Sequence, residues 1–199
     1  MKDEKDYIQK LTEIRSMMEQ SSKFLSLSGW AGIMAGIYAL IGTYIGYHFL
    51  DYNFYEIPIA SPFGIYILAL AVLGLAISTA TFCSYRKALK NKRKLWNYTT
   101  RKLIIDMMVP LSTGSIFILM LINLDFDRFV VPASLIFYGL ALYNAGKFTL
   151  NEVKILGLIQ VCLGLLSVYF YQNSLLWWSL GFGVAHIVYG IYMHFKYER

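Results

Sequence analysis

Long apolar segments alternate with short polar connections along most of the chain. A helix rises about 1.5 Å per residue, so about 20 apolar residues cross the ~30 Å hydrocarbon core of a bilayer. Six segments approach or exceed that length, at 26–50, 63–84, 103–124, 129–146, 153–171 and 175–195. The pattern therefore predicts an all-α, polytopic membrane protein whose six transmembrane helices form three hairpins.

The first 25 residues follow a different pattern from the membrane domain, which we place at 26–199. Apolar side chains recur there at steps of three and four, at Tyr7, Leu11, Ile14, Met18 and Leu25. This spacing predicts a cytosolic amphipathic helix. It is either a short coiled coil that pairs protomers or recruits a partner, or a helix that lies on the membrane or caps the bundle. Fewer than three heptads rarely hold a coiled coil, which favours the second interpretation.

The charged connections give an orientation. The run YRKALKNKRKLWNYTTRK, at 85–102, holds eight Lys or Arg residues and no acid, so we expect it to be a cytoplasmic loop. On this topology seventeen of the 18 basic residues are cytoplasmic, and only Arg128 lies outside. Both termini are then cytoplasmic.

Composition and charge limit the class of protein. With 57% hydrophobic and 15% charged residues, the chain is too apolar for an ordinary soluble domain. The net charge of +6 is concentrated between apolar segments, which argues against nucleic acid as a partner. Cys83 and Cys162 fall at different predicted depths, so no disulfide is expected. The charged N-terminal stretch argues against a removable signal peptide.

Part of the basic run is a candidate for binding anionic lipid headgroups, namely Lys90, Lys92, Arg93 and Lys94. Membrane topology together with general headgroup attraction explains the same residues more simply. The partners expected from the sequence are the bilayer itself and either a second copy of the chain or another membrane protein.

Small residues form ridges along the first and last predicted spans. Candidates for close helix packing are Gly32, Gly36, Gly42 and Gly46 in the first span, and Gly183 and Gly190 in the last. Packing within one chain is favoured over dimerisation, because six helices have neighbours of their own. On this assignment Leu40 faces lipid.

The candidate intramembrane polar site consists of His186, Gln160, Asp106 and Asn144. Polar groups gather in the cytosolic half of the predicted bundle, which suggests a polar vestibule open to the cytosol. Helix ends in the headgroup region are the other interpretation, which we favour for Asn144, Lys147, Glu152, Lys154 and His194. Pro110 lies four residues after Asp106 and lacks the N–H that would bond the Asp106 carbonyl.

His186 lies near the middle of the last span. At 100° per residue it shares a stripe with Ser179, Gly183, Gly190 and His194, so we expect its ring to project from the small-residue face, buried in protein. It is either a proton-relay or ligand-binding group, or a neutral histidine hydrogen-bonded across a helix interface.

Motifs for other chemistries are absent from the sequence. It has no HExxH, no CxxC and no carboxylate cluster, so no metal or cofactor is expected. It has no GxSxG and no cysteine beside a histidine, so we do not expect an enzyme.

Two stretches carry a resemblance, the opening IRSMMEQSSKFLSLSGWAGIMAGIYALIG and the end LGLIQVCLGLLSVYFYQNSLLWWSLGFGVAHIVYGIYMHFKYER. They resemble a group of small membrane proteins of Bacteroidota with no assigned activity, which implies a bacterial inner membrane and no mechanism. Three consecutive helical hairpins carry glycines seven residues apart, as in Gly157 and Gly164. In this respect the predicted architecture loosely resembles that of six-helix acid-resistance membrane proteins.

Two functions are compatible with these features. The first is a non-catalytic membrane protein, a stress-sensing or accessory component that acts through partners. The second is a small-solute or proton-coupled transporter or channel. A continuous polar tunnel would favour transport, whereas a dry, glycine-packed interior would favour the partner role.

Overall fold

The computed structural model describes residues 28–49, 63–90 and 96–198, and these residues are helical without any strand. The elements are α2 (Gly29–Phe49), α3 (Phe63–Lys90), α4 (Tyr98–Asn123), η1 (Asp127–Phe129), α5 (Val130–Ala145), α6 (Asn151–Tyr169), η2 (Tyr171–Asn173), α7 (Ser174–Trp178), the π-helical η3 (Ser179–Ala185) and α8 (His186–Tyr197). Six stretches of helix are long and apolar enough to cross a membrane, as the sequence predicts. The predicted amphipathic helix at 1–25 lies outside the described residues, as do Lys92, Arg93 and Lys94.

The basic region differs from the prediction of a loop at 85–102. Helix α3 continues to Lys90, and α4 already begins at Tyr98, so most of that run is helical. Asn97 caps α4 by accepting a hydrogen bond from the Thr100 backbone N–H at 2.8 Å. Lys and Arg are good helix formers and can carry their charge to the headgroup level from a helix end, which explains the extension.

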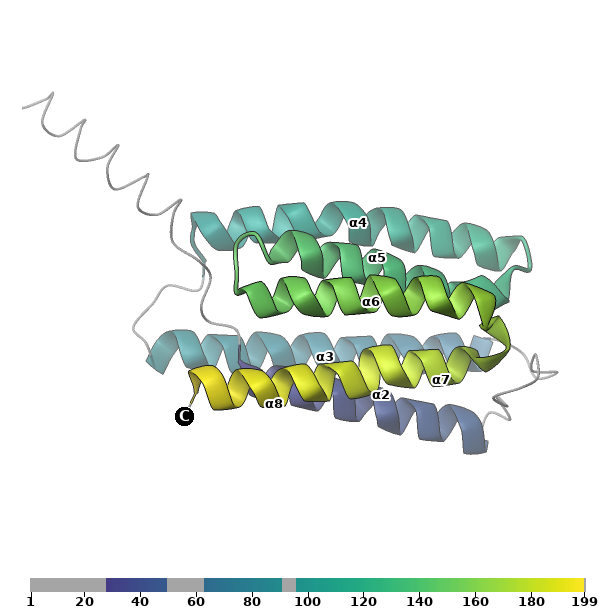
Figure 1. Cartoon of the computed structure of the whole chain (residues 1–199), viewed down its shortest axis with the longest axis horizontal. Coiled ribbons are helices and arrows are strands. Elements are labelled where there is room, and N and C mark those ends of the chain that lie inside the picture. The colour runs from purple at the N-terminus through teal and green to yellow at the C-terminus, as the bar shows by residue number, and fades with distance from the viewer. Residues whose placement is uncertain (1–27, 50–62, 91–95, 199) are drawn as a thin grey trace, which may run out of the picture.

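The helices form two layers of three (Figure 1). One layer contains α4, α5 and α6; the other contains α2, α3 and the composite helix α7–η3–α8. Within the layers α5 packs extensively on α6, and α2 packs on both α3 and α8. The layers meet where α5 and α6 contact α7, η3 and α8. Because the closest pairs do not all join consecutive spans, the arrangement as three hairpins stays a prediction.

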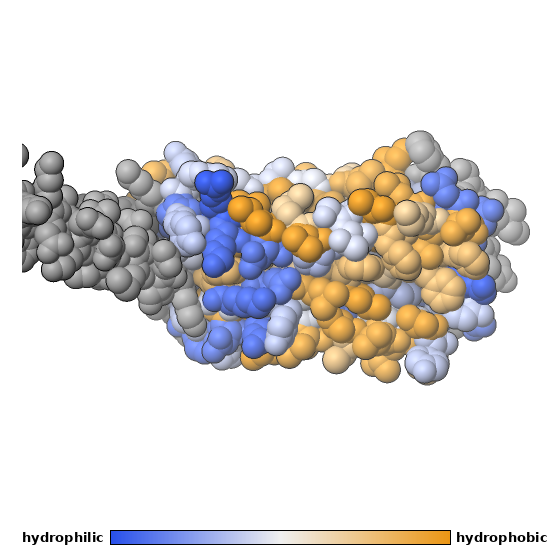
Figure 2. Space-filling model, turned by 90° about the horizontal axis from the view of Figure 1, so that it is seen from above, coloured by the Kyte–Doolittle hydropathy of each residue, from blue (hydrophilic) through white to orange (hydrophobic). Residues whose placement is uncertain are grey.

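The outer surface is apolar around the middle of the molecule. Figure 2 shows a hydrophobic band, with hydrophilic residues gathered at the end where the C-terminus lies in Figure 1. Large apolar side chains are exposed along α3, where Leu70 is 67% exposed. An apolar belt of this extent would be a liability in water and suits the hydrocarbon of a bilayer.

Glycines bring α2 and α8 into close contact. A Cβ built on Gly36 would lie 2.5 Å from the Gly183 carbonyl oxygen, and one on Gly190 would lie 2.5 Å from the Ile33 nitrogen. Only glycine allows two backbones to approach so closely. Gly32 packs on the same helix at Gly190, whereas Gly42 and Gly46 face Val72 and Ile65 of α3. The expectation that Leu40 faces lipid is wrong, because Leu40 packs on Gly183.

A carboxylate ties three helix ends together at the hydrophilic end. Glu198 Oε1 accepts hydrogen bonds from the Gly29 backbone N–H at 3.1 Å and from Lys87 Nζ at 2.9 Å, and Oε2 lies 3.0 Å from His194 Nδ1. Burial alone would raise the pKa of Glu198, but hydrogen bonds from His194, Lys87, Gly29 and Ser28 outweigh it and lower the pKa to about 2. The N-terminus of α2 thereby gains a charged cap.

Candidate intramembrane polar site

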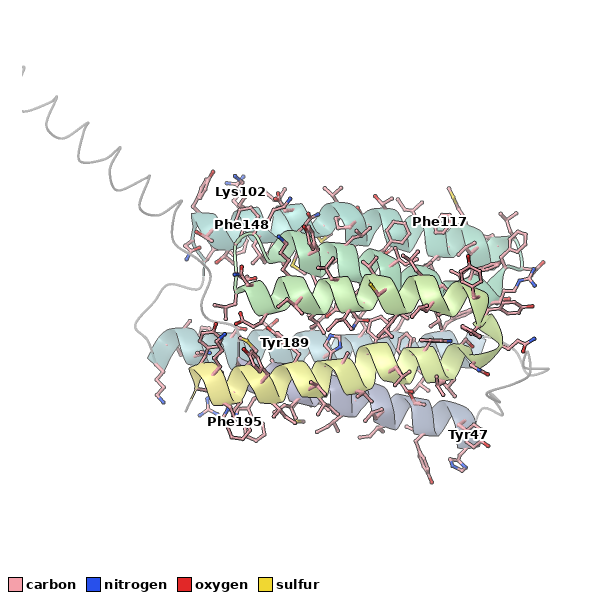
Figure 3. All side chains as sticks on the ribbon, viewed as in Figure 1. Tyr47, Lys102, Phe117, Phe148, Tyr189 and Phe195 are labelled. Atoms are coloured by element: carbon pink, nitrogen blue, oxygen red, sulfur yellow. The ribbon has the colours of Figure 1, made fainter. Side chains whose placement is uncertain are left out.

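A polar cluster lies where the two layers meet. Tyr138 comes from α5, Gln160 from α6 and His186 from the start of α8. Gln160 is 0% exposed and His186 is 6% exposed. Tyr189, one turn further along α8, points into the space between the layers (Figure 3) and packs beside an apolar core of Leu142, Ala145, Val153 and Leu156.

Hydrogen bonds of ordinary length join the members of this cluster. Tyr138 Oη lies 2.9 Å from His186 Nε2, and His186 Nδ1 lies 3.0 Å from the Gly181 carbonyl oxygen. Gln160 Nε2 donates to the same carbonyl oxygen at 2.7 Å. One carbonyl therefore receives donors from two side chains, one on each layer.

These contacts select a tautomer of His186. A carbonyl oxygen can only accept, so Nδ1 carries the proton and donates to Gly181. Nε2 is then the acceptor of the Tyr138 hydroxyl proton. Gln160 Nε2, at 3.4 Å from Nδ1, therefore faces another donor and directs one of its two hydrogens to Gly181 instead. The imidazole is neutral in this arrangement, with both ring nitrogens satisfied.

The π-helical segment η3 supplies the shared carbonyl. A π-helix widens the turn, and such segments often occur at functional sites. The Gly181 Cα leaves room for Gln160, because a Cβ there would lie 2.8 Å from Gln160 Oε1. That Oε1 atom is buried and has no hydrogen-bond partner among the described residues. The cluster thus contains one unused acceptor.

Aromatic rings line one side of the cluster. Phe182 lies between Trp178 and His186, with ring centroids 4.5 Å and 6.2 Å away. The Tyr138 ring stacks on His186, with centroids 5.6 Å apart, and lies tilted against Phe182 at 5.4 Å. These rings surround the imidazole with apolar surface.

The direction of the His186 ring differs from the sequence-based expectation. Gly183 and Gly190 face α2, whereas the imidazole reaches α5 and α6 in the other layer. The expected stripe assumed 100° per residue throughout, and the π-helical turn just before His186 breaks that regular spacing.

Asp106 and Asn144 form a separate contact between α4 and α5. Asn144 Nδ2 donates to the Asp106 backbone carbonyl at 3.5 Å. This is the carbonyl that Pro110 leaves without its helical donor, so the amide partly replaces the missing bond. The structure therefore brings together His186 and Gln160 but not all four predicted site residues.

Polar residues at the hydrophilic end pair with one another. Lys196 Nζ and Tyr197 Oη donate to Glu152 Oε1 at 2.6 Å and 2.9 Å. Lys154 lies over the Tyr143 ring, and Lys102 lies over the Phe148 ring, as the labelled side chains in Figure 3 show for the second pair. Lys90, the one described member of the predicted headgroup set, is exposed.

Sequence reasoning missed Tyr138 and Gly181. Sixteen tyrosines occur in the chain, and nothing in the local sequence of Tyr138 sets it apart. Its distance from His186, 48 positions along the chain, makes the contact a product of how the layers pack. Gly183, the other glycine of η3, was a signal for close packing but not for a π-helical turn.

Comparisons with protein-family models, with curated proteins and with solved structures found no match to this chain. Among the described residues no three His, Cys, Asp or Glu side chains gather as a metal site would require. We therefore infer a function from the geometry of the cluster.

Proposed function

We propose that this protein is a non-catalytic, multi-pass component of a bacterial inner membrane that senses acidification and acts through partners. Both termini are cytoplasmic in this proposal. The observation that carries it is the closed network of Tyr138, His186 and the Gly181 carbonyl, buried between two helix layers.

Protonation would disturb this network at one atom. A second proton on the ring goes to Nε2, which then donates and can no longer accept from Tyr138. The Tyr138 hydroxyl must then rotate so that its own hydrogen points away from His186. Among the described residues His186 is hydrogen-bonded to the Tyr138 hydroxyl and the Gly181 carbonyl, with the Gln160 amide nearby, and none of these groups is charged.

The surrounding elements offer the new cation little compensation. The titratable groups on elements packed against the site include Tyr138 on α5, Tyr189 on α8 and Glu152 on α6. Glu152 lies eight residues before Gln160, about 12 Å along the helix, and is already engaged by Lys196. A buried, unpaired cation is costly, so acid favours a state in which the layers separate enough to hydrate His186.

The native cysteines allow a direct test. Cys83 lies on α3 and Cys162 on α6, one in each layer, and they are the only two cysteines in the chain. Spin labels on both, in lipid nanodiscs, report the separation of the layers. On acidification from about pH 8 to about pH 5, where imidazoles titrate, we expect the distance distribution to shift reversibly.

His186→Gln is the matched control, because glutamine retains a donor and an acceptor but cannot take up a proton. Its distance distribution should be the same at both pH values. A shift of equal size in His186→Gln, or no shift in the parent, would contradict acid sensing through this cluster.

Gln160 Oε1 supports the second candidate, a proton-coupled transporter or channel. A buried acceptor without a partner could receive a hydrogen-bond donor from a passing solute or a hydronium ion. Proton flux into proteoliposomes under a pH gradient separates the two functions. Proton flux that Gln160→Leu abolishes would favour transport. Vesicles that show no proton flux, in a protein whose layers still separate on acidification, would favour sensing.

A further inference from the structure

A second site lies between the layers at the end of the bundle opposite the C-terminus. A pocket there, with an empty volume of about 580 Å³ including its open mouth, is bounded by α2, α3, α5 and α7. Its walls are largely apolar, and they include Leu68, Ala69, Val131 and Trp178. The apolar lining and the open mouth suit an alkyl chain better than a polar solute.

One side of the pocket carries a charge. Asp127, in η1, lines it and accepts a hydrogen bond from the Tyr66 hydroxyl. A carboxylate accepts about four hydrogen bonds, so Tyr66 leaves capacity for further donors. Tyr66 comes from α3 and Asp127 from η1, directly before α5, so this bond also joins the two walls of the pocket.

A fixed positive charge follows directly in the chain. The Arg128 guanidinium lies 5.2 Å from the Phe129 ring centroid and 5.3 Å from that of Tyr171. Cation–π contacts with these rings hold the guanidinium at the end of the bundle. Arg128 directly follows Asp127 in the chain. The pocket is thus lined by one carboxylate, and a guanidinium stands on the next residue of the chain.

We propose that this pocket binds a phospholipid with a primary-ammonium headgroup, phosphatidylethanolamine in its simplest form. One acyl chain fills the apolar pocket, the ammonium donates to Asp127, and the phosphate pairs with Arg128. An anionic headgroup lacks a cation for Asp127. A choline headgroup has a cation but no N–H donor for the carboxylate.

Quenching of Trp178 fluorescence tests this site. The other tryptophans, Trp30, Trp96 and Trp177, are changed to Phe, so that only the pocket residue fluoresces. The protein is reconstituted with acyl-brominated phosphatidylethanolamine, phosphatidylcholine or phosphatidylglycerol. We expect about a threefold preference for the ethanolamine lipid, the size typical of one partly exposed ion pair.

Two substitutions assign the preference to the pocket. Asp127→Asn retains an acceptor for Tyr66 but removes the charge, and it should abolish the preference. Ala69→Phe fills the pocket and should lower quenching by every lipid, whereas Leu70→Phe, on an exposed neighbour, should not. Equal quenching by the three lipids, or a preference that survives Asp127→Asn, would overturn the proposal.

Intact-protein mass spectrometry of proteins that keep all their tryptophans gives a second measurement. The expected result is one retained ethanolamine lipid per chain in the parent and in Leu70→Phe, and none in Ala69→Phe. Equal retention in all three would overturn the site. The outcome is separate from acid sensing, because His186 does not line this pocket.

Discussion

Single glycines set how closely α2 and α8 approach. At Gly36 and Gly190 the atoms nearest to an added Cβ include backbone atoms of the facing helix, which cannot move aside as a side chain can. The GxxxG spacing was enough to predict small-residue packing in α2. It could not identify the partner helix or the role of Leu40, because those depend on how the last span returns to the first.

Gly36→Leu should destabilise the protein by about 3 kcal/mol, near the upper end of overpacking costs, since the helices must separate. Gly74→Leu is the matched control, because a Cβ at Gly74 has no neighbour within 4 Å among the described residues. The measurement is the thermal unfolding temperature of the two variants and the parent in detergent. If both variants unfold at the temperature of the parent, or only Gly74→Leu is destabilised, the packing face is assigned wrongly.

Glu198→Gln should destabilise the end of the bundle in a pH-dependent way. The pKa of this carboxyl falls from the ordinary 4.5 to about 2 in the folded protein. A lowered carboxyl pKa stabilises the fold above about pH 4.5, and that contribution is lost as the pH falls toward 2. We expect a loss of about 1–2 kcal/mol at neutral pH.

The measurement is the difference in unfolding temperature between parent and Glu198→Gln over a pH series. The difference should be largest at neutral pH and shrink steadily below about pH 4.5. A difference that stays constant down to pH 2 would mean that the charge of Glu198 is not what stabilises the helix ends.

At the scale of elements, apolar length and charge predicted the six spans well, with ends that differ by a few residues at most positions. The two largest differences, at Lys90 and Tyr98, arise because basic residues continue helices rather than ending them. The π-helical η3 was beyond prediction. Within it the Gly181 carbonyl accepts from Gln160 and His186, which belong to separate helices, and the local sequence does not record that packing.

Gly181→Ala tests the importance of this element. A new methyl group would crowd Leu135 and Gln160 Oε1, so η3 must shift and the two donors must lose their common acceptor. We expect a loss of about 1–3 kcal/mol in thermal unfolding, and Gly74→Ala should be close to neutral. If Gly181→Ala unfolds at the same temperature as the parent, η3 does not require glycine at this position.

At the scale of the whole molecule, the described ends of the chain lie at one end of the bundle, together with the ends of α3 and α5 (Figure 1). From the positive-inside pattern we expect that end to be cytoplasmic. Reporter fusions after Lys94, after Glu152 and at the C-terminus should therefore report cytoplasm. Fusions after Asn53, Asp127 and Asn173 should report the outside, and one clear reversal would contradict the topology.

The state of the His186 ring is the most direct test of the account, because both the interlayer network and its response to acid depend on that ring. The measurement is the ¹⁵N NMR spectrum of the imidazole in lipid, assigned with His186→Gln. At neutral pH we predict a neutral ring with its proton on Nδ1 and with Nε2 accepting from Tyr138, and a reversible second proton on acidification. A proton on Nε2 alone, or a ring already doubly protonated at neutral pH, would contradict the account.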